Sequence, residues 1–92
     1  MIKTFADKDA QALFNGTRVR RLVQIEGPAR RKLEYLDAAA KLDDLRVPPG
    51  NRLEALKGDR AGQYSIRIND QYRLCFRWKN GDAFEVEITD YH

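Results

Sequence analysis

The chain has 92 residues, a formal net charge of +3, one cysteine and one histidine, so it is long enough for one domain with a small core. Its 42% hydrophobic content argues against disorder, and its first ten residues, MIKTFADKDA, have no apolar run long enough for a signal peptide or a membrane helix. One cysteine excludes an internal disulfide, and no Cys/His cluster has zinc spacing, so we expect a single cytoplasmic domain over residues 1–92 without a metal or other cofactor.

The first predicted elements are a short strand and a short helix. Residues 2–5, IKTF, read as the strand. Residues 7–16, DKDAQALFNG, predict the helix, because Asp7 is a favourable N-cap and the Asn-Gly pair at the end is a stop signal.

A longer helix is predicted over residues 28–42. Pro28 suits its first turn, and PPGN at residues 48–51 would end any helix. The apolar positions at helical spacing, which predict the buried face, are Ala29, Leu33, Leu36 and Ala40.

From residue 51 onward the apolar spacing changes to that of strands. The predicted strands are residues 51–56, 63–68, 71–78 and 83–91. Apolar side chains of the last three share one face: Tyr64, Ile66, Ile68, Tyr72, Leu74, Phe76, Trp78, Phe84, Val86 and Ile88. The opposite face is polar, and we interpret Cys75 on it as a filler of space.

The loop lengths follow from the requirement that the apolar side chains of neighbouring strands share one face. Ile66, Tyr72 and Leu74 share a face only if the loop at NDQ has an odd number of residues, which favours three. The same reasoning gives three or five residues around KNGDA. The predicted fold class is therefore α+β, with two N-terminal helices packed on one face of a small, twisted, mainly antiparallel sheet.

The polar face allows two interpretations. Its arginines could bind RNA phosphate, or they could form cross-strand ion pairs, and the pattern alone favours ion pairs. Glu85 and Glu87 are then the predicted partners of Arg77 and Arg67. His92 is equally open, either a frayed end or an acid/base group that titrates near neutral pH.

Three motifs carry a resemblance to a known family. LKGDRAGQYSIR, NDQYRLCF and the closing DYH resemble the HigB-type toxins of the RelE/ParE superfamily, and the likeness covers almost the whole chain. Residues 38–63 are most similar to the slow-growth branch that includes GraT. The resemblance implies a RelE-like ribonuclease of a type II toxin–antitoxin system, which enters the ribosomal A site and cuts mRNA without a metal.

The resemblance also implies a chemistry and a set of residues. The 2′-hydroxyl beside the scissile bond attacks, so a base, an acid and cations for the charge on phosphorus are needed. The positions that match the family's motifs are His92 as leading acid or base, Tyr91 to stack on a base or bind phosphate, Asp90 to orient His92 or act as a second acid/base group, and Arg73 and Lys57 for phosphate charge.

Glu54 departs from the family pattern, because some members have histidine there. A Glu–His pair can still act as base and acid, but it adds negative charge near an anionic substrate, and we hypothesise a weaker or slower toxin. The alternative is that Glu54 is an ion-pair partner of Arg52 or Arg73.

The implied partners are mRNA, the ribosome, and a HigA-type helix-turn-helix antitoxin through which alone operator DNA would be bound. No membrane contact is expected. The candidates for contact with RNA are Arg20, Arg21, Arg30, Arg31, Arg67 and Arg77. A second hypothesis is a ParE-like inhibitor that binds DNA gyrase and cleaves nothing, and a third is a degenerate, regulatory member. The DYH end and the Lys57/Arg73 pair favour the nuclease.

Overall fold

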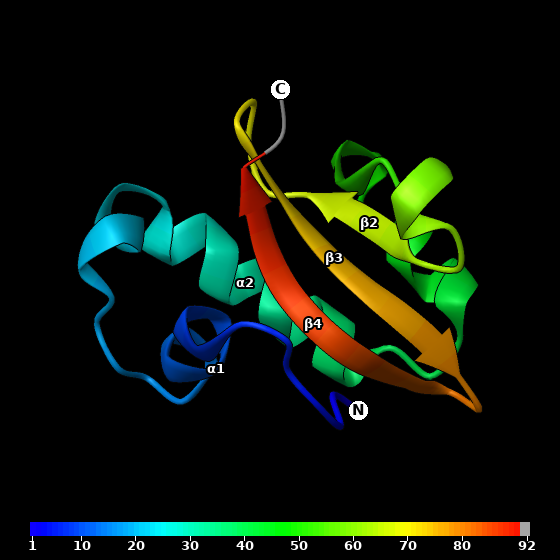
Figure 1. Cartoon of the computed structure of the whole chain (residues 1–92), viewed down its shortest axis with the longest axis horizontal. Coiled ribbons are helices and arrows are strands. Elements are labelled where there is room, and N and C mark those ends of the chain that lie inside the picture. Colours follow the sequence, from blue (N-terminus) through cyan, green and yellow to red (C-terminus); the bar gives the residue numbers. More distant parts are fainter. Residues whose placement is uncertain (91–92) are drawn as a thin grey trace.

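The computed structural model describes residues 1–90 and consists of a helical layer on one face of a sheet (Figure 1). The helices are α1 (Lys8–Phe14) and α2 (Glu26–Ala38). The strands are β1 (Glu54–Ala55), β2 (Tyr64–Arg67), β3 (Tyr72–Lys79) and β4 (Asp82–Asp90). They lie in the order β1-β2-β3-β4, and each neighbouring pair is antiparallel. The predicted α+β fold class is confirmed.

The capping chemistry of α1 agrees with the sequence. The Asp7 carboxylate accepts a hydrogen bond from the Asp9 backbone N–H at 2.9 Å, which satisfies one of the free donors of the first turn. Asn15 is the C-cap, and Gly16 follows with a φ of 90°. No helix within residues 1–90 has the length and apolar character needed to cross a bilayer.

Helix α2 is displaced from its prediction at both ends. It begins at Glu26, directly after a 3-10 helix over Arg20–Ile25, and ends at Ala38. It stops there because the Asp44 carboxylate accepts from the backbone N–H groups of Ala40 and Lys41, each at 3.0 Å, which starts a separate 3-10 helix. The prediction that Ala40 lies on the buried face is wrong, because this residue is exposed.

The predicted strand at residues 2–5 forms only partly. Ile2 and Phe5 make isolated parallel bridges to Ala83 and Val86. The Lys3 N–H donates to the Ala83 carbonyl at 2.8 Å, and the Ala83 N–H donates to the Met1 carbonyl at 3.0 Å. The N-terminal segment therefore lies along the outer edge of β4 (Figure 1).

The core lies between the helical layer and the apolar face of the sheet. Its fully buried large side chains are Leu13, Leu22, Leu33, Leu36, Leu45, Ile66, Leu74, Phe76 and Val86. These residues come from both layers, so burial of their apolar surface is what holds the helices on the sheet.

The β2–β3 hairpin has the predicted three-residue loop. The Ile68 N–H donates to the Tyr72 carbonyl at 3.0 Å, which leaves residues 69–71 as the loop. The Asn69 side chain accepts from the backbone N–H groups of Gln71 and Tyr72 at 2.9 and 2.7 Å. This local hydrogen bonding is typical of asparagine in turns and explains the loop.

The β3–β4 hairpin is shorter than predicted. Lys79 pairs with Asp82, so the loop is the two residues Asn80 and Gly81, whose φ values are 53° and 82°. An Asn-Gly pair with both φ values positive is the preferred two-residue hairpin turn. The prediction of three or five residues is wrong.

A β-bulge in β4 compensates for this even-numbered loop. Cys75 pairs with Glu87 and Arg77 pairs with Phe84, so two residues of β4 oppose Phe76 alone. The extra residue, Glu85, has a φ of 53°. Beyond the bulge the side chains of β4 alternate in the opposite sense. Ala83 is buried in the core, and Phe84 lies on the polar face. The prediction that Phe84 shares a face with Val86 and Ile88 is therefore wrong.

Candidate active site

Arg73 on β3 is a buried and tightly held cation. It is only 8% exposed. Its Nε donates to the Ser65 hydroxyl at 2.8 Å, and its Nη2 donates to the Arg52 carbonyl at 2.9 Å and lies 3.3 Å from Glu54 Oε1. A buried charge is costly unless its donors are satisfied, so these partners both stabilise the guanidinium and fix its orientation.

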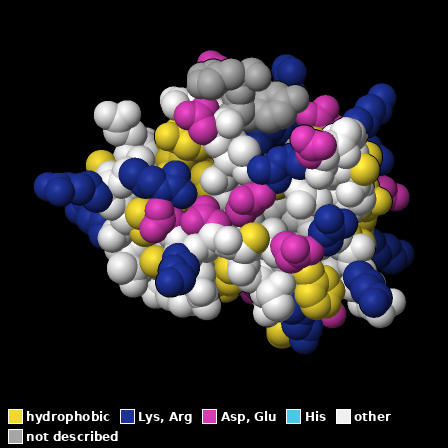
Figure 2. All heavy atoms as spheres, in the orientation of Figure 1, with side chains coloured by type: hydrophobic (Ala, Val, Ile, Leu, Met, Phe, Trp, Pro, Cys, Tyr) yellow, Lys and Arg dark blue, Asp and Glu magenta, His cyan; other side chains and the backbone are white. Residues whose placement is uncertain are grey.

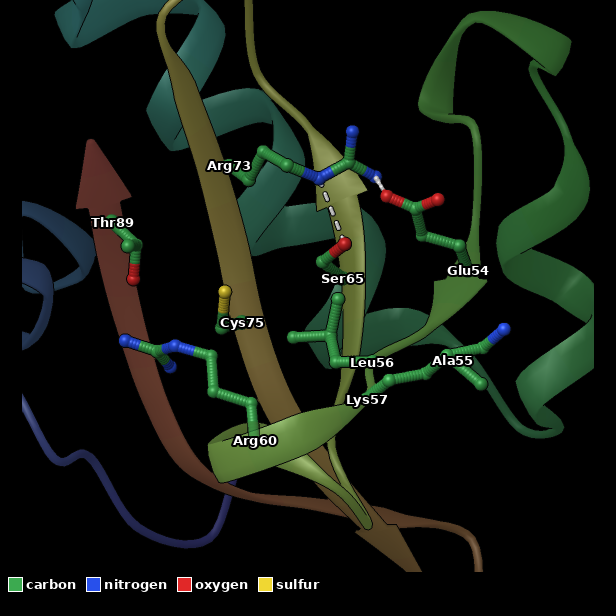
Figure 3. Close-up of a pocket in the computed structure, with 9 residues that line it drawn as sticks. All are labelled: Glu54, Ala55, Leu56, Lys57, Arg60, Ser65, Arg73, Cys75 and Thr89. Atoms are coloured by element: carbon green, nitrogen blue, oxygen red, sulfur yellow. Dashed lines mark hydrogen bonds and ion pairs between the residues drawn. The ribbon is translucent and has the colours of Figure 1, made fainter. Parts of the chain in front are cut away.

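A pocket of about 360 Å³ opens beside this arginine on the polar face of the sheet. Its lining residues, drawn in Figure 3, are Glu54, Ala55, Leu56, Lys57, Arg60, Ser65, Arg73, Cys75 and Thr89. Arg73 and Glu54 stand at one end, the Arg60 side chain at the other, and Ser65 and Cys75 lie between them (Figure 3). Lys57 extends away from Arg60, toward the side of β1 (Figure 3).

Arg60 belongs to a 3-10 helix, Gly58–Arg60, in the connection between β1 and β2. Its Nη1 donates to Glu87 on β4 at 2.6 Å and to Gln63 at 2.9 Å. The hydrogen bond to Glu87 raises the pKa of Arg60 above its ordinary value. Because β4 is two strands away from β2, this side chain ties the β1–β2 connection to the far side of the polar face.

The predicted pairing of Glu87 with Arg67 is therefore wrong. Strand β3 lies between β2 and β4, so Arg67 is opposite Arg73 and Glu87 is opposite Cys75. Arg67 pairs instead with Asp70 in the neighbouring loop. The predicted pair of Arg77 and Glu85 is confirmed, at 2.7 Å.

Cys75 and Thr89 contribute the remaining polar atoms of the pocket. Cys75 is 2% exposed, and its burial raises the pKa of the thiol above its ordinary value. The thiol is therefore neutral at physiological pH, which fits the interpretation of Cys75 as a filler. The Thr89 hydroxyl is buried and interacts with the Cys75 thiol.

The structure brings three of the predicted catalytic residues, Glu54, Lys57 and Arg73, to one pocket. Asp90 ends β4 one residue beyond Thr89, but it pairs with Tyr72, so its side chain has the alternation of the apolar face and does not line the pocket. The Asp90 carboxylate accepts from the Gln71 side-chain amide at 3.1 Å. The remaining predicted catalytic residues, Tyr91 and His92, lie outside the described residues.

Sequence reasoning missed Arg60, Ser65 and Thr89 as parts of the site. Ser65 and Thr89 could have been found, because the alternation of their strands places each side chain on the polar face. There they lie diagonal to Arg73 and opposite it, respectively. Arg60 carried no such signal, since loop residues have no periodicity.

The basic residues predicted for RNA contact fall into two groups. Arg21 pairs with Asp7 at 3.3 Å and with Asp9, and Arg30 pairs with Glu26 at 3.1 Å. Arg20 and Arg31 are exposed and have no ion pair within residues 1–90, and they stand on the helical layer. The structure therefore does not bring these four arginines to the pocket, and two of them have their charge matched by acids.

The site is a positively charged, partly enclosed pocket. Its lining includes three cations, Lys57, Arg60 and Arg73, and one carboxylate, Glu54, while Arg60 is also paired with Glu87. Fixed cations of this kind stabilise negative charge that develops on a bound phosphate. No cluster of three or more His, Cys, Asp or Glu side chains suited to a metal occurs within residues 1–90.

Comparison with known sequences places the chain in a family. Residues 3–92 match the family described as RelE-like toxin of type II toxin-antitoxin system HigB. The chain is 47% identical to Toxin HigB-1 of Vibrio cholerae over 90 residues, covering 96% of this chain and 95% of that protein. It is 33% identical to Endoribonuclease HigB of Proteus vulgaris over 93 residues, covering the whole of both.

Solved structures agree at the level of the fold. The YoeB-YefM complex from Staphylococcus aureus has a chain that matches with a TM-score of 0.53 and 18% identity, covering 100% of this chain and 98% of that one. The YoeB/ParE toxin from Agrobacterium tumefaciens matches with a TM-score of 0.50 and 20% identity, covering 99% and 100%. The chain with this pocket therefore belongs to the HigB-like toxins of type II toxin–antitoxin systems, within the RelE superfamily.

Proposed function

We propose that this toxin is an endoribonuclease that cuts mRNA in the ribosomal A site and so inhibits translation and growth. The observation that carries the proposal is the pocket of about 360 Å³, whose lining includes Lys57, Arg60 and Arg73. The 33% identical relative from Proteus vulgaris, named an endoribonuclease, supports the same activity.

The reaction we propose is attack of the 2′-hydroxyl on the adjacent phosphate, with release of the 5′-oxygen. Arg73 is suited to bind the phosphate and stabilise charge on the phosphorane, because its partners already hold it and little reorganisation is needed. Lys57 adds a second, more mobile cation. The products are a 2′,3′-cyclic phosphate and a 5′-hydroxyl, and we propose that no metal takes part.

Proton transfer requires a base and an acid near the phosphate. We propose His92 as the leading acid or base, with Asp90 and Tyr91 as its neighbours in the sequence. Glu54 is the second candidate, since its carboxylate is half exposed and lines the pocket.

The ribosome would supply most of the substrate affinity. A toxin that acts at one site on the mRNA gains proximity and orientation from the complex, so its own pocket needs few contacts. We also propose that its partner is a HigA-type helix-turn-helix antitoxin. That antitoxin would bind the operator DNA. The structural relative from Staphylococcus aureus, described as a YoeB-YefM complex, supports an antitoxin partner in general.

The test compares wild type with Arg73→Gln and with a chain lacking His92, on ribosomes programmed with a defined mRNA. The 5′ ends of the mRNA are mapped by primer extension, with and without EDTA. We expect in-codon cleavage by wild type that EDTA does not abolish, and a loss of cleavage in both variants. Tyr35→Ala on the helical layer serves as the matched surface control and should cleave normally.

Other outcomes separate the alternatives. Intact mRNA in every reaction, together with DNA damage after induction of the toxin in cells, would contradict the nuclease and support gyrase inhibition. Intact mRNA without DNA damage would indicate a purely regulatory protein. Equal cleavage with and without His92 would move the acid/base role to Glu54 or Asp90.

A further inference from the structure

A second cavity, of about 610 Å³, lies near the turn of the β3–β4 hairpin. Its lining residues are Thr4, Gly62, Arg77, Trp78, Lys79, Asn80, Phe84 and Glu85. In Figure 2, hydrophobic, basic and acidic side chains lie side by side over this end of the hairpin, at the lower right. None of the catalytic residues proposed above belongs to it.

The cavity continues the polar face on which the active-site pocket lies. Arg73 and Arg77 are both on β3 at the same parity, four residues apart, which is about 13 Å along a strand. Phe84 is the direct cross-strand partner of Arg77, so its ring shares the face of the arginine. The two cavities are therefore consecutive along one strand.

The β-bulge at Glu85 is what brings an aromatic ring to this face. Without the extra residue, the Phe84 side chain would lie on the buried face with Val86 and Ile88, and the Ala83 side chain would point outward. The bulge instead buries the small Ala83 and leaves the larger Phe84 partly exposed. Burial of apolar surface alone would favour the reverse, so the arrangement suits a ring that contacts a ligand.

Gly62 leaves room for the arginine of this cavity. A Cβ atom at Gly62 would lie 2.7 Å from Arg77 Nη1, and the φ of Gly62 is 92°, which disfavours other residues. The positive φ is what requires glycine here, because the contacted atom is the far end of a flexible side chain.

The charges of the cavity favour an anion with an apolar part. Arg77 and Lys79 provide two cations against the single carboxylate of Glu85. The Arg77–Glu85 pair is 44% and 54% exposed, so exchanging the carboxylate for a phosphate costs little. A ring beside mobile cations is the combination with which proteins bind single-stranded nucleic acids.

We propose that this cavity is a second RNA subsite, in which Phe84 stacks on a base and Arg77 binds the phosphate of a nucleotide flanking the scissile bond. The inference rests on the proposed ribonuclease function and assigns part of its substrate recognition. Arg77 is here a binding residue, and the bulge is the device that positions Phe84 beside it.

The chain carries its own reporter for this subsite, because Trp78 is its only tryptophan and lines the cavity. The experiment titrates the toxin with a heptanucleotide RNA that is 2′-O-methylated throughout, so that attack by the 2′-hydroxyl is blocked. Tryptophan fluorescence is followed for wild type, Phe84→Leu and Arg77→Gln. Phe84→Leu keeps an apolar side chain and removes the stacking surface. The matched controls are Tyr35→Ala and Arg46→Gln, an exposed aromatic and an exposed, ion-paired arginine outside both cavities.

We expect saturable quenching in wild type and in both controls, and an affinity about tenfold lower in Phe84→Leu and in Arg77→Gln, as removal of one stacked base or one bound phosphate implies. With programmed ribosomes, Phe84→Leu should raise the toxin concentration needed for half-maximal cleavage and leave the saturated rate near that of wild type.

Failure of this inference can be told from failure of the proposed function. Normal cleavage by wild type with no quenching, or with equal affinity in Phe84→Leu, would overturn the subsite and leave the nuclease intact. Loss of antitoxin binding in Phe84→Leu, with RNA affinity unchanged, would also overturn it and assign the cavity to the antitoxin. Quenching without any mRNA cleavage would retain the subsite and contradict the nuclease.

Discussion

Arg73 Nη2 and Glu54 Oε1 lie 3.3 Å apart, so the best-positioned cation of the active-site pocket is partly neutralised by a carboxylate of the same pocket. The two side chains differ in burial: that of Arg73 is 10% exposed and that of Glu54 is 49% exposed. The arginine is therefore the fixed partner and the glutamate the mobile one. A bound phosphate would compete with Glu54 for the guanidinium.

The first prediction concerns this competition. Glu54→His should increase mRNA cleavage on programmed ribosomes, by up to about tenfold, which corresponds to about 1.4 kcal/mol in the activation barrier. The reason is that histidine removes a negative charge next to an anionic substrate and can still transfer a proton, whereas glutamine would also remove the second acid/base candidate. Asp43→Asn, an exposed carboxylate paired with Arg46, is the control and should have no effect. No gain in Glu54→His would refute the idea that this carboxylate weakens the toxin.

The second prediction concerns the support of Arg73. Ser65→Ala removes the hydroxyl that accepts from Arg73 Nε, and so takes one hydrogen bond from a buried guanidinium. We expect a loss of about 1–3 kcal/mol in the free energy of unfolding, measured with urea. Cleavage at saturating ribosomes should also fall, because the guanidinium is no longer fixed. Thr17→Ala, at an exposed position, should change neither quantity.

A purely structural role of Ser65 would give a different result. Stability would fall, but the saturated cleavage rate of the folded Ser65→Ala protein would equal that of wild type. Measuring both quantities at a temperature well below the unfolding midpoint separates the two cases.

The third prediction concerns pH. Burial raises the pKa of the Cys75 thiol above its ordinary value, so between the ordinary and the raised pKa the unfolded chain loses a proton that the folded chain keeps. The free energy of unfolding should therefore fall as pH rises through this window, by at most about 1.4 kcal/mol per pH unit. Urea unfolding of wild type and Cys75→Ala at several pH values isolates this contribution. Parallel pH profiles for the two proteins would contradict the prediction.

The fourth prediction concerns binding to the ribosome. Arg20 and Arg31 have no ion pair within residues 1–90, whereas Arg21 and Arg30 are paired with acids. Replacing Arg20 and Arg31 together by glutamine should weaken ribosome binding, and should reduce its salt dependence by about one unit of slope for each phosphate that is no longer bound. The Arg21/Arg30 double variant should have the smaller effect. Equal loss of ribosome binding in the two double variants, or no loss in either, would contradict the assignment of Arg20 and Arg31 to ribosome contact.

The sequence predicted those parts of the fold that depend on periodicity and local capping. Asp7 as N-cap, the three-residue loop after Ile68 and the polar parity of Arg73 all follow from local rules, and all are confirmed. The β3–β4 hairpin was predicted wrongly because the parity argument assumed a regular ladder. The bulge at Glu85 makes an even-numbered loop compatible with a continuous core, and an alternating pattern does not reveal it.

The candidate site could be predicted only as far as its strands. Glu54 and Arg73 could be named as possible partners, and the ion pair between them is confirmed. Arg60 could not be named as part of the site, because its position depends on how the connection between β1 and β2 folds. That fold brings the Arg60 side chain to Glu87 on β4. Interactions of this kind arise from tertiary packing, for which a single sequence gives no periodic signal.

The N-terminal segment along β4 has a consequence for how partners can bind. The outer edge of β4 would otherwise offer free backbone groups to any extended peptide, but residues 1–6 already bond to positions 83–86. At the opposite edge, β1 has two residues. Both margins of the sheet are thus poor templates for strand addition, which also limits self-association into fibrils. An antitoxin would therefore have to recognise this toxin through side chains on its helices, its loops or its polar face.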